Sequence, residues 1–252
     1  MEQQALTRIC LLGELRVWRP DGLQVDPEEW RTGKTRDLLR LLALENGHVV
    51  RPASLIEKLW PEVSEERAGN SLRTATSRIR HATGTPCVAR RMHGIVLLDS
   101  WVDVVEYREL AARARTAVRA ADHDLVLRLG WAAEDLHLGE FHANDDDSAW
   151  ARAERRDLRR IRRELLTDVA TSALALRRVR EAVDLATIAV RLDRTSEAAH
   201  RALMLGLAEL GETAAALRVF ETYRAQLVEG LGVDPSPQTL ELHLDLLRGR
   251  RS

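Results

Sequence analysis

After residue 100 the chain is a nearly unbroken series of segments whose apolar residues recur at helical spacing, and this series restricts the fold more than any other feature. Glycines and short polar links separate the segments. They lie near residues 103–120, 124–137, 148–176, 180–192, 196–209, 213–229 and 237–248. We therefore predict a mainly α-helical protein with a small β component, in which residues 100–252 form an all-α domain.

Within this helical part the chain resembles itself when it is shifted by 34 residues. The aligned positions are Ala182, Ala186 and Ala189 against Ala216, Phe220 and Tyr223. Such an alternation of small and large residues is typical of tetratricopeptide repeats, whose stacked helices present a groove to a protein or peptide partner. The alignment favours a tetratricopeptide-like stack, and an unspecified antiparallel bundle remains the alternative.

The N-terminal part of the chain carries a different pattern. Short β-prone pieces in Thr7–Val25 are interrupted by turn signals and predict a small antiparallel sheet. Leucines at helical spacing predict a first helix over Thr35–Glu45. A second helix is predicted over Pro52–Trp60, because Pro52 is typical of the first position of a helix. Further on, β-prone residues on both sides of Gly94 predict a β-hairpin. We therefore divide the chain into a domain of residues 1–99 and a domain of residues 100–252.

The segment Arg67–His81 predicts a third helix whose residue types separate by face at about 3.6 residues per turn. The apolar face comprises Ala68, Leu72, Ala75, Thr76 and Ile79. The opposite row is polar and comprises Asn70, Thr74, Ser77 and His81. Arginines flank this row, Arg67 and Arg78 on one side and Arg73 and Arg80 on the other. The pattern suits a helix in a DNA major groove, and an amphipathic surface helix with solvated arginines would share it.

The neighbouring elements decide between these two interpretations. A sheet, three helices and a terminal hairpin, in this order, are the parts of a winged helix-turn-helix, whose third helix lies in the major groove. The hairpin has a basic tip, where Arg90, Arg91 and His93 precede Gly94, and it would reach phosphates or the minor groove. Because two separate basic elements indicate the same partner, we expect DNA binding, although the formal net charge of −1 gives no sign of it.

Patterns for catalysis, cofactors and metal ions are weak. Gly33–Thr35 imitates the end of a phosphate-binding loop, but Glu28 stands where that loop requires a glycine. His137, His142 and Asp145–Asp147 match no metal-ligand spacing. No arrangement of a nucleophile with a base stands out either. The sequence therefore predicts a protein that is not an enzyme and has no cofactor or metal ion.

Cysteine usage and hydropathy indicate the compartment. Cys10 and Cys87 lie in apolar surroundings without ligand or disulfide spacing, so we expect two reduced, partly buried thiols. No signal-peptide pattern opens the chain, and no apolar run approaches the length that spans a membrane. We therefore expect a soluble cytoplasmic protein without a membrane partner.

Two sets of segments resemble a known family. The N-terminal part is similar to the OmpR-type winged-helix domain of the Streptomyces antibiotic regulatory proteins, in RTGKTRDLLRLLALENGHVVRPASLIEKLWPE, SLRTATSRIRHAT and RRMHGIVLL. The remainder resembles the bacterial transcriptional activation domain that follows it in that family, in VDVVEYREL, WARAERRDLRRIRRELL, EAAHRALMLGLAELGETAAAL and EGLGVDPSPQTLELH. The resemblance covers nearly the whole chain, and the segments occur in the order of the family.

This resemblance implies a transcriptional activator that binds direct repeats near a promoter's −35 element and recruits RNA polymerase subunits, including the sigma factor. The controlled genes would form a secondary-metabolite cluster, as in antibiotic biosynthesis. The protein would be a dimer at least on DNA and would associate with the nucleoid. Carried over by position, the candidate DNA contacts are Asn70, Ser71, Arg73, Thr74, Ser77, Arg78 and Arg80 on the third helix, Arg90, Arg91 and His93 on the hairpin, and Arg31, Lys34 and Arg36 at the start of the first helix.

The sequence departs from the family pattern in two places. Ile95 follows Gly94, where such hairpins often carry an aromatic residue. Glu65 and Glu66 precede the third helix, where they suit its positive dipole end but would repel phosphate. One alternative function remains, a protein-interaction adaptor that uses the helical repeats without binding DNA. A small-molecule sensor in the helical domain has no sequence feature specific to it.

Overall fold

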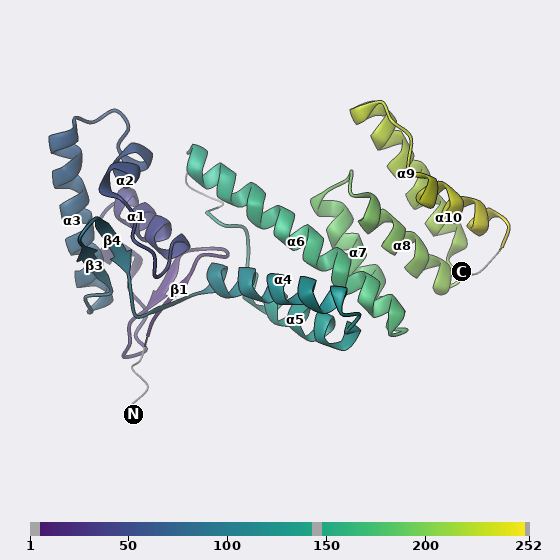
Figure 1. The fold of residues 1–252 in the computed structure, drawn as a ribbon, viewed down its shortest axis with the longest axis horizontal. Coiled ribbons are helices and arrows are strands. Elements are labelled where there is room, and N and C mark those ends of the chain that lie inside the picture. Colours follow the sequence, from purple (N-terminus) through teal and green to yellow (C-terminus); the bar gives the residue numbers. More distant parts are fainter. Residues whose placement is uncertain (1–5, 143–147, 250–252) are drawn as a thin grey trace. The chain divides into compact units, whose positions relative to one another are not determined.

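The computed structural model describes residues 6–142 and 148–249 and is mainly helical (Figure 1). The chain forms two compact units, one of residues 1–108 and 136–155 and the other of residues 109–135 and 156–252. Within the described ranges no helix is long and apolar enough to cross a membrane. The boundary expected between residues 99 and 100 falls inside the first unit, which also takes a segment from later in the chain.

The first unit contains a small sheet near its N-terminal end. Strands β1 (Thr7–Cys10) and β2 (Arg16–Trp18) pair antiparallel, with Ile9 opposite Val17, which confirms the predicted antiparallel pair. A third strand, β5 (Ser100–Val102), pairs with the other edge of β1 in parallel and was not predicted. The facing residues Ile9 and Val17 are at most 1% exposed, so this face of the sheet belongs to the core.

Three helices follow the sheet, as predicted, after a short 3-10 helix, η1 (Pro27–Trp30). Their bounds are α1 (Gly33–Leu44), α2 (Pro52–Leu59) and α3 (Glu65–Thr83). Thr32 caps α1 by accepting a hydrogen bond from the Thr35 backbone N–H, and proline occupies the first turn of α2. The shared core of the three helices includes Leu38, Leu42, Leu55, Leu59, Leu72 and Ile79, each at most 3% exposed. Burying a side chain of this size contributes about 1.5–3 kcal/mol.

The predicted hairpin is present and packs beside α3 (Figure 1). Strands β3 (Val88–Arg91) and β4 (Gly94–Leu97) pair antiparallel, with Arg91 opposite Gly94 at the tip. On its other side β4 exchanges two backbone hydrogen bonds with Val50, through Ile95, at 2.8 and 2.9 Å. This pairing connects the hairpin to the segment between α1 and α2. Cys10 and Cys87 are free buried thiols, in agreement with the prediction.

A buried carboxylate joins the sheet to the next helix, α4 (Asp103–Arg119). Asp103 is 2% exposed and accepts backbone hydrogen bonds from Leu11 at 2.8 Å, Leu12 at 2.9 Å and Val104 at 2.7 Å. Together with the pairing of β5, these contacts explain why the first unit extends past residue 99.

The helices of the later part of the chain agree closely with the predicted segments. They are α5 (His123–Leu136), α6 (Ala149–Ala175), α7 (Val179–Leu192), α8 (Glu197–Glu209), α9 (Thr213–Leu231) and α10 (Pro237–Leu247). Helix α8 packs against both α7 and α9. A Cβ atom added at Gly206 of α8 would lie 2.6 Å from Val183 Cγ2, so the glycine lets α7 and α8 approach closely.

The small and large residues aligned by the shift of 34 positions are all buried in the second unit. They are Ala182, Ala186, Ala189, Ala216, Phe220 and Tyr223, none more than 2% exposed. Tyr223 of α9 stacks on His200 of α8 with ring centroids 4.4 Å apart. The alternation therefore marks the packed faces of α7 and α9 rather than an exposed groove.

Candidate nucleic-acid interface

Helix α3 separates its residues by face as the sequence predicts. The apolar row of Ala68, Leu72, Ala75, Thr76 and Ile79 is buried, each residue at most 6% exposed. The opposite row of Asn70, Thr74, Ser77 and His81 is exposed. Glu65 and Glu66 are also exposed, in the first turn of the helix, where a carboxylate stabilises the positive end of the dipole. The helix thus presents its hydrogen-bonding side to solvent.

The polar side of α3 is locally ordered. The Arg73 guanidinium donates to Asn70 Oδ1, and the Thr74 hydroxyl donates to the Asn70 carbonyl oxygen at 3.0 Å. Ser71 and Arg78 are half-buried at the edges of this side. Apart from these bonds along the helix, the side chains of this row make no hydrogen bond within the described part of the chain, so they have donors and acceptors to offer, as a surface that reads base edges must.

A shallow hollow of about 400 Å³ lies at one edge of this side. Ser77, Arg78 and His81 of α3 line it together with Glu29 and Arg31. Arg31 has a backbone φ of 61°, in the left-handed region that non-glycine residues rarely adopt. The fold thus holds the exposed Arg31 guanidinium beside α3 in spite of a strained backbone.

Arg80 has a structural contact in addition to its place beside the polar row. Its Nε donates to the Val88 carbonyl oxygen of β3 at 2.6 Å, which ties α3 to the hairpin. The sequence pattern indicated only a phosphate contact for this residue. A substitution of Arg80 would therefore change the hairpin as well as the surface charge.

The hairpin tip is basic and open to solvent. Arg90, Arg91 and His93 are exposed, and Met92 between them is 93% exposed. Ile95, by contrast, is 2% exposed and packs inside, so it cannot take the surface position of an aromatic residue. The tip therefore offers charge and hydrogen-bond donors rather than an apolar contact.

The start of α1 brings further positive charge to this unit. Lys34 is exposed, and the first turn of α1 contains no acidic residue, so the dipole end is uncompensated. Arg36 is half-buried and lines a separate cavity of about 410 Å³ with Trp30, Arg40 and His142. One short segment thus contains three basic residues, Arg31, Lys34 and Arg36. Of these, Arg36 is half-buried beside the cavity.

Gly94 fixes the hairpin against the α1–α2 connection. A Cβ atom at this position would lie 2.2 Å from the Val50 carbonyl oxygen. We expect Gly94→Ala to separate β4 from Val50 and to lower the free energy of unfolding by about 1–3 kcal/mol, because overpacking forces backbone shifts. Urea unfolding monitored by circular dichroism measures the loss. Gly69→Ala is the control, since its Cβ would meet no atom within 4 Å and the helix should gain stability; equal effects of the two substitutions would contradict the argument.

Sequence reasoning missed a buried ionic cluster in the first unit. Asp37 Oδ1 lies 2.8 Å from Arg40 Nη1 and 3.1 Å from His142 Nε2, and the three residues are at most 7% exposed. His142, which matches no metal-ligand spacing in the sequence, contacts Asp37, a residue 105 positions earlier. Residues Asp145–Asp147 lie outside the described residues. In the described parts of the chain, no three His, Cys, Asp or Glu side chains gather as metal ligands.

The cluster makes stability depend on pH. Burial alone would raise the pKa of Asp37, but the hydrogen bond with His142 and the charge of Arg40 outweigh it and lower this pKa. A folded-state pKa below the unfolded value gives stability that is present at neutral pH and lost as the pH falls through the acidic range. We expect Asp37→Asn to reduce stability near pH 7 but to flatten its further decline toward pH ~3. Denaturant unfolding across this range tests the expectation, which parallel pH profiles of variant and parent would overturn.

Comparisons with known proteins address the chain as a whole. Residues 102–247 match the family described as the bacterial transcriptional activator domain. The regulatory protein AfsR of Streptomyces coelicolor is 30% identical over 256 residues, which cover 98% of this chain but 25% of that protein. The chain thus spans about a quarter of AfsR. The regulatory protein DnrI of Streptomyces peucetius is 29% identical, with 96% of this chain and 92% of DnrI covered.

A solved structure shares the fold. It is that of Mycobacterium tuberculosis EmbR in complex with a low affinity phosphopeptide. The TM-score is 0.83 at 21% identity, and the match covers 96% of this chain and 65% of that one. The helices and strands of both compact units therefore have counterparts in a known protein.

Proposed function

The chain belongs to the bacterial transcriptional activator domain family, that of the Streptomyces antibiotic regulatory proteins, and from this membership we propose that it is a sequence-specific DNA-binding activator. Its homologues are transcriptional regulators. In this proposal residues 1–99 form a winged-helix domain that reads DNA, and residues 100–252 form the tetratricopeptide-like activation domain. The protein acts in the cytoplasm at the nucleoid and carries out no catalysis.

One observation carries the proposal. Helix α3 exposes a row of short polar side chains between arginines, while its apolar row is buried, and the basic hairpin tip belongs to the same unit. A helix of this kind can place Thr74 and Ser77 at base edges in the major groove. The arginines then bind phosphates, which supplies affinity but little sequence information.

Each candidate residue has a role under this proposal. Base contacts come from Asn70, Ser71, Thr74 and Ser77, and phosphate contacts from Arg73, Arg78 and Arg80. On the hairpin, Arg90, Arg91 and His93 reach neighbouring phosphates or the minor groove. At the start of α1, Arg31, Lys34 and Arg36 bind phosphate with the help of the helix dipole. The exposure of most of these side chains supports the assignment, and Arg36 and Arg80 have structural contacts as well.

The proposed partners follow from the family. The protein binds direct repeats near a −35 element, as a dimer at least on DNA, and recruits RNA polymerase subunits including the sigma factor. The controlled promoters lie in a secondary-metabolite gene cluster. Similarity to DnrI over nearly the full length of both chains supports this assignment.

A gel-shift titration tests DNA binding. The purified chain is mixed with promoter fragments that carry direct repeats from its own genomic neighbourhood, and footprinting locates the bound sequence. We expect a shift that survives an excess of unrelated DNA and a footprint over two repeats. If no fragment is shifted at low salt, the adaptor alternative replaces the activator.

Base-reading residues differ from phosphate-binding residues in their response to salt. We expect Thr74→Ala or Ser77→Ala to relax the preference for one base pair by about 1–3 kcal/mol, with the salt dependence of binding unchanged. Competition between the natural repeat and single-base variants measures the preference. Thr116→Ala, at an exposed position of α4, serves as control. An unchanged order of preference in both α3 variants would remove these residues from the interface.

A further inference from the structure

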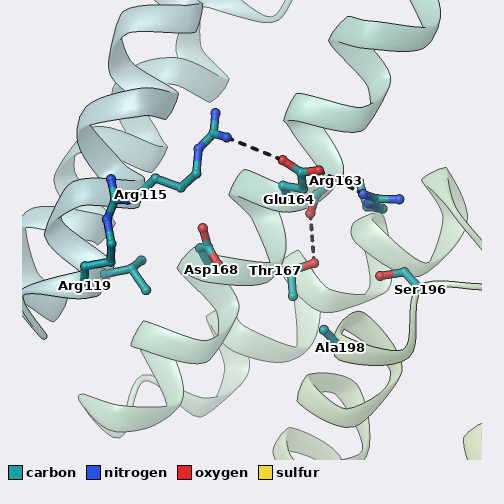
Figure 2. Close-up of a pocket in the computed structure, with 9 residues that line it drawn as sticks. Arg115, Arg119, Arg163, Glu164, Thr167, Asp168, Ser196 and Ala198 are labelled. Atoms are coloured by element: carbon teal, nitrogen blue, oxygen red, sulfur yellow. Dashed lines mark hydrogen bonds and ion pairs between the residues drawn. The ribbon is translucent and has the colours of Figure 1, made fainter. Parts of the chain in front are cut away.

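The second unit has a hollow of about 470 Å³ that the DNA-binding proposal does not use (Figure 2). Its walls come from α4, from α6 and from the residues around the start of α8. Arg115 and Arg119 stand on the α4 side, and Glu164 and Asp168 on the α6 side (Figure 2). Both signs of charge therefore line one open space.

The two carboxylates of the hollow differ in their partners. Glu164 is engaged, because its Oε1 lies 3.2 Å from Arg160 and 3.1 Å from Arg163, and its Oε2 lies 3.9 Å from Arg115. Asp168 is half-buried and has neither a hydrogen bond nor an ion pair within the described part of the chain. In Figure 2 it lies between the α4 arginines and Thr167. No group of the described residues donates a hydrogen bond to this half-buried carboxylate, so only the remaining water offsets its partial loss of hydration.

Unused donors lie on the other walls of the same hollow. Arg119 is exposed and donates only to the Thr116 hydroxyl, at 3.3 Å, with no carboxylate within 4 Å among the described residues. Ser196 occupies the N-cap position of α8, yet its hydroxyl makes no capping bond. Val118 and Ala198 add a small apolar surface. Asp168 and Arg119 are thus opposite charges that share a hollow without pairing with each other.

We propose that this hollow binds a small zwitterion of the α-amino-acid class, with its ammonium group at Asp168 and its carboxylate at Arg119. A purely cationic ligand would meet Arg115, Arg119 and Arg163, and a purely anionic ligand would meet Asp168 and Glu164. Only a ligand that carries both a positive and a negative charge can form an ion pair with Asp168 and with Arg119 at the same time. The Ser196 hydroxyl supplies a further hydrogen bond, and Val118 contacts the aliphatic part of the ligand.

The electrostatics of Asp168 agree with this assignment. Burial raises the pKa of its carboxyl group, the charge of Glu164 raises it further, and the charge of Arg115 opposes both. A bound ammonium group would stabilise the ionised carboxylate. Binding is therefore expected to weaken as the pH falls and Asp168 becomes protonated.

Saturation-transfer difference NMR on the full chain tests the proposal directly. The probes are pools of the protein amino acids, followed by the binding amino acid alone, its N-acetyl derivative and its amide. We expect a signal from at least one free amino acid and its loss when either charge is blocked. No signal from any pool, or equal signals from the two blocked derivatives, would overturn the proposal. The readout does not involve DNA, so its outcome is separate from that of the gel shift.

Two charge-removing variants locate the site. We expect Asp168→Asn and Arg119→Gln each to weaken binding on the order of 10-fold or more, because each removes a charge-assisted hydrogen bond. Arg113→Gln is the matched control, since Arg113 is exposed on α4 and does not line the hollow. Thermal unfolding establishes that all three variants are folded. Unchanged affinity in Asp168→Asn would place the ligand elsewhere and refute the assignment.

Discussion

Asp103→Ala is expected to lower the free energy of unfolding of the first unit by about 3–5 kcal/mol. The carboxylate is 2% exposed and accepts the backbone N–H groups of Leu11, Leu12 and Val104. Burial raises the pKa of Asp103, and the three donors oppose that shift. In either protonation state, alanine leaves the donors without a partner in the core. Each unsatisfied buried donor costs about 1–3 kcal/mol, so the effects accumulate.

Asp122→Ala is the control for Asp103→Ala, because it also removes a carboxylate that accepts a backbone hydrogen bond. Asp122 accepts the Leu125 backbone N–H at 3.0 Å but is exposed, so water replaces the lost bond and the cost is about 1 kcal/mol. Denaturant unfolding followed by circular dichroism compares both variants with the parent. Because β1 pairs with β5 just before Asp103, the first unit of the variant should also lose amide protection in β1. Similar losses in the two variants would show that Asp103 does not hold the sheet to α4.

The helices were predictable because their cause is local. Apolar spacing, Pro52 at a helix start and Gly84 after α3 lie within the elements that they define. The separation of α3 into a buried and an exposed row follows from the same periodicity. Segments with such signals agree with the observed helices to within a few residues.

Contacts between distant segments were not predictable in this way. Strand β5 is three residues long and pairs with β1, almost a hundred positions earlier. So short a segment shows no alternation of apolar and polar residues from which a strand could be predicted. Asp37 likewise contacts His142, 105 positions away, and Asp103 accepts hydrogen bonds from Leu11 and Leu12, 92 and 91 positions away. Their carboxylates resemble surface charges in the sequence, because burial of an acid depends on donors that only the folded chain supplies.

In the candidate interface, too, the features with a local cause were predictable and those that depend on packing between elements were not. Exposure of Asn70, Thr74 and Ser77 followed from helical geometry. The bond from Arg80 to Val88 and the inward side of Arg36 depend on how elements pack, so charge pattern alone did not reveal them. Residue type therefore indicates what a surface can bind, and packing decides which of its charges are already engaged.

The hairpin arginines give the largest effect expected on DNA binding. The double variant Arg90→Ala/Arg91→Ala removes two exposed guanidinium groups from the tip, and each phosphate contact contributes about 0.9 to the slope of log K against log salt. We expect a slope lower by about 1.8 and, at moderate salt, an affinity lower by roughly 10- to 100-fold. Fluorescence anisotropy with a labelled direct repeat at several salt concentrations gives both quantities.

The effect should be electrostatic and confined to DNA binding. Both side chains are exposed, and neither forms an ion pair among residues 6–142 and 148–249, so unfolding by urea should be unchanged in the double variant. Arg113→Ala removes a comparable exposed arginine from α4 and should leave the slope unchanged. Because phosphate contacts carry no sequence information, natural and altered repeats should lose affinity equally, in contrast to the Thr74 and Ser77 variants. A slope equal to that of the parent would show that the hairpin does not contact DNA. The DNA-binding proposal would then rest on α3 alone.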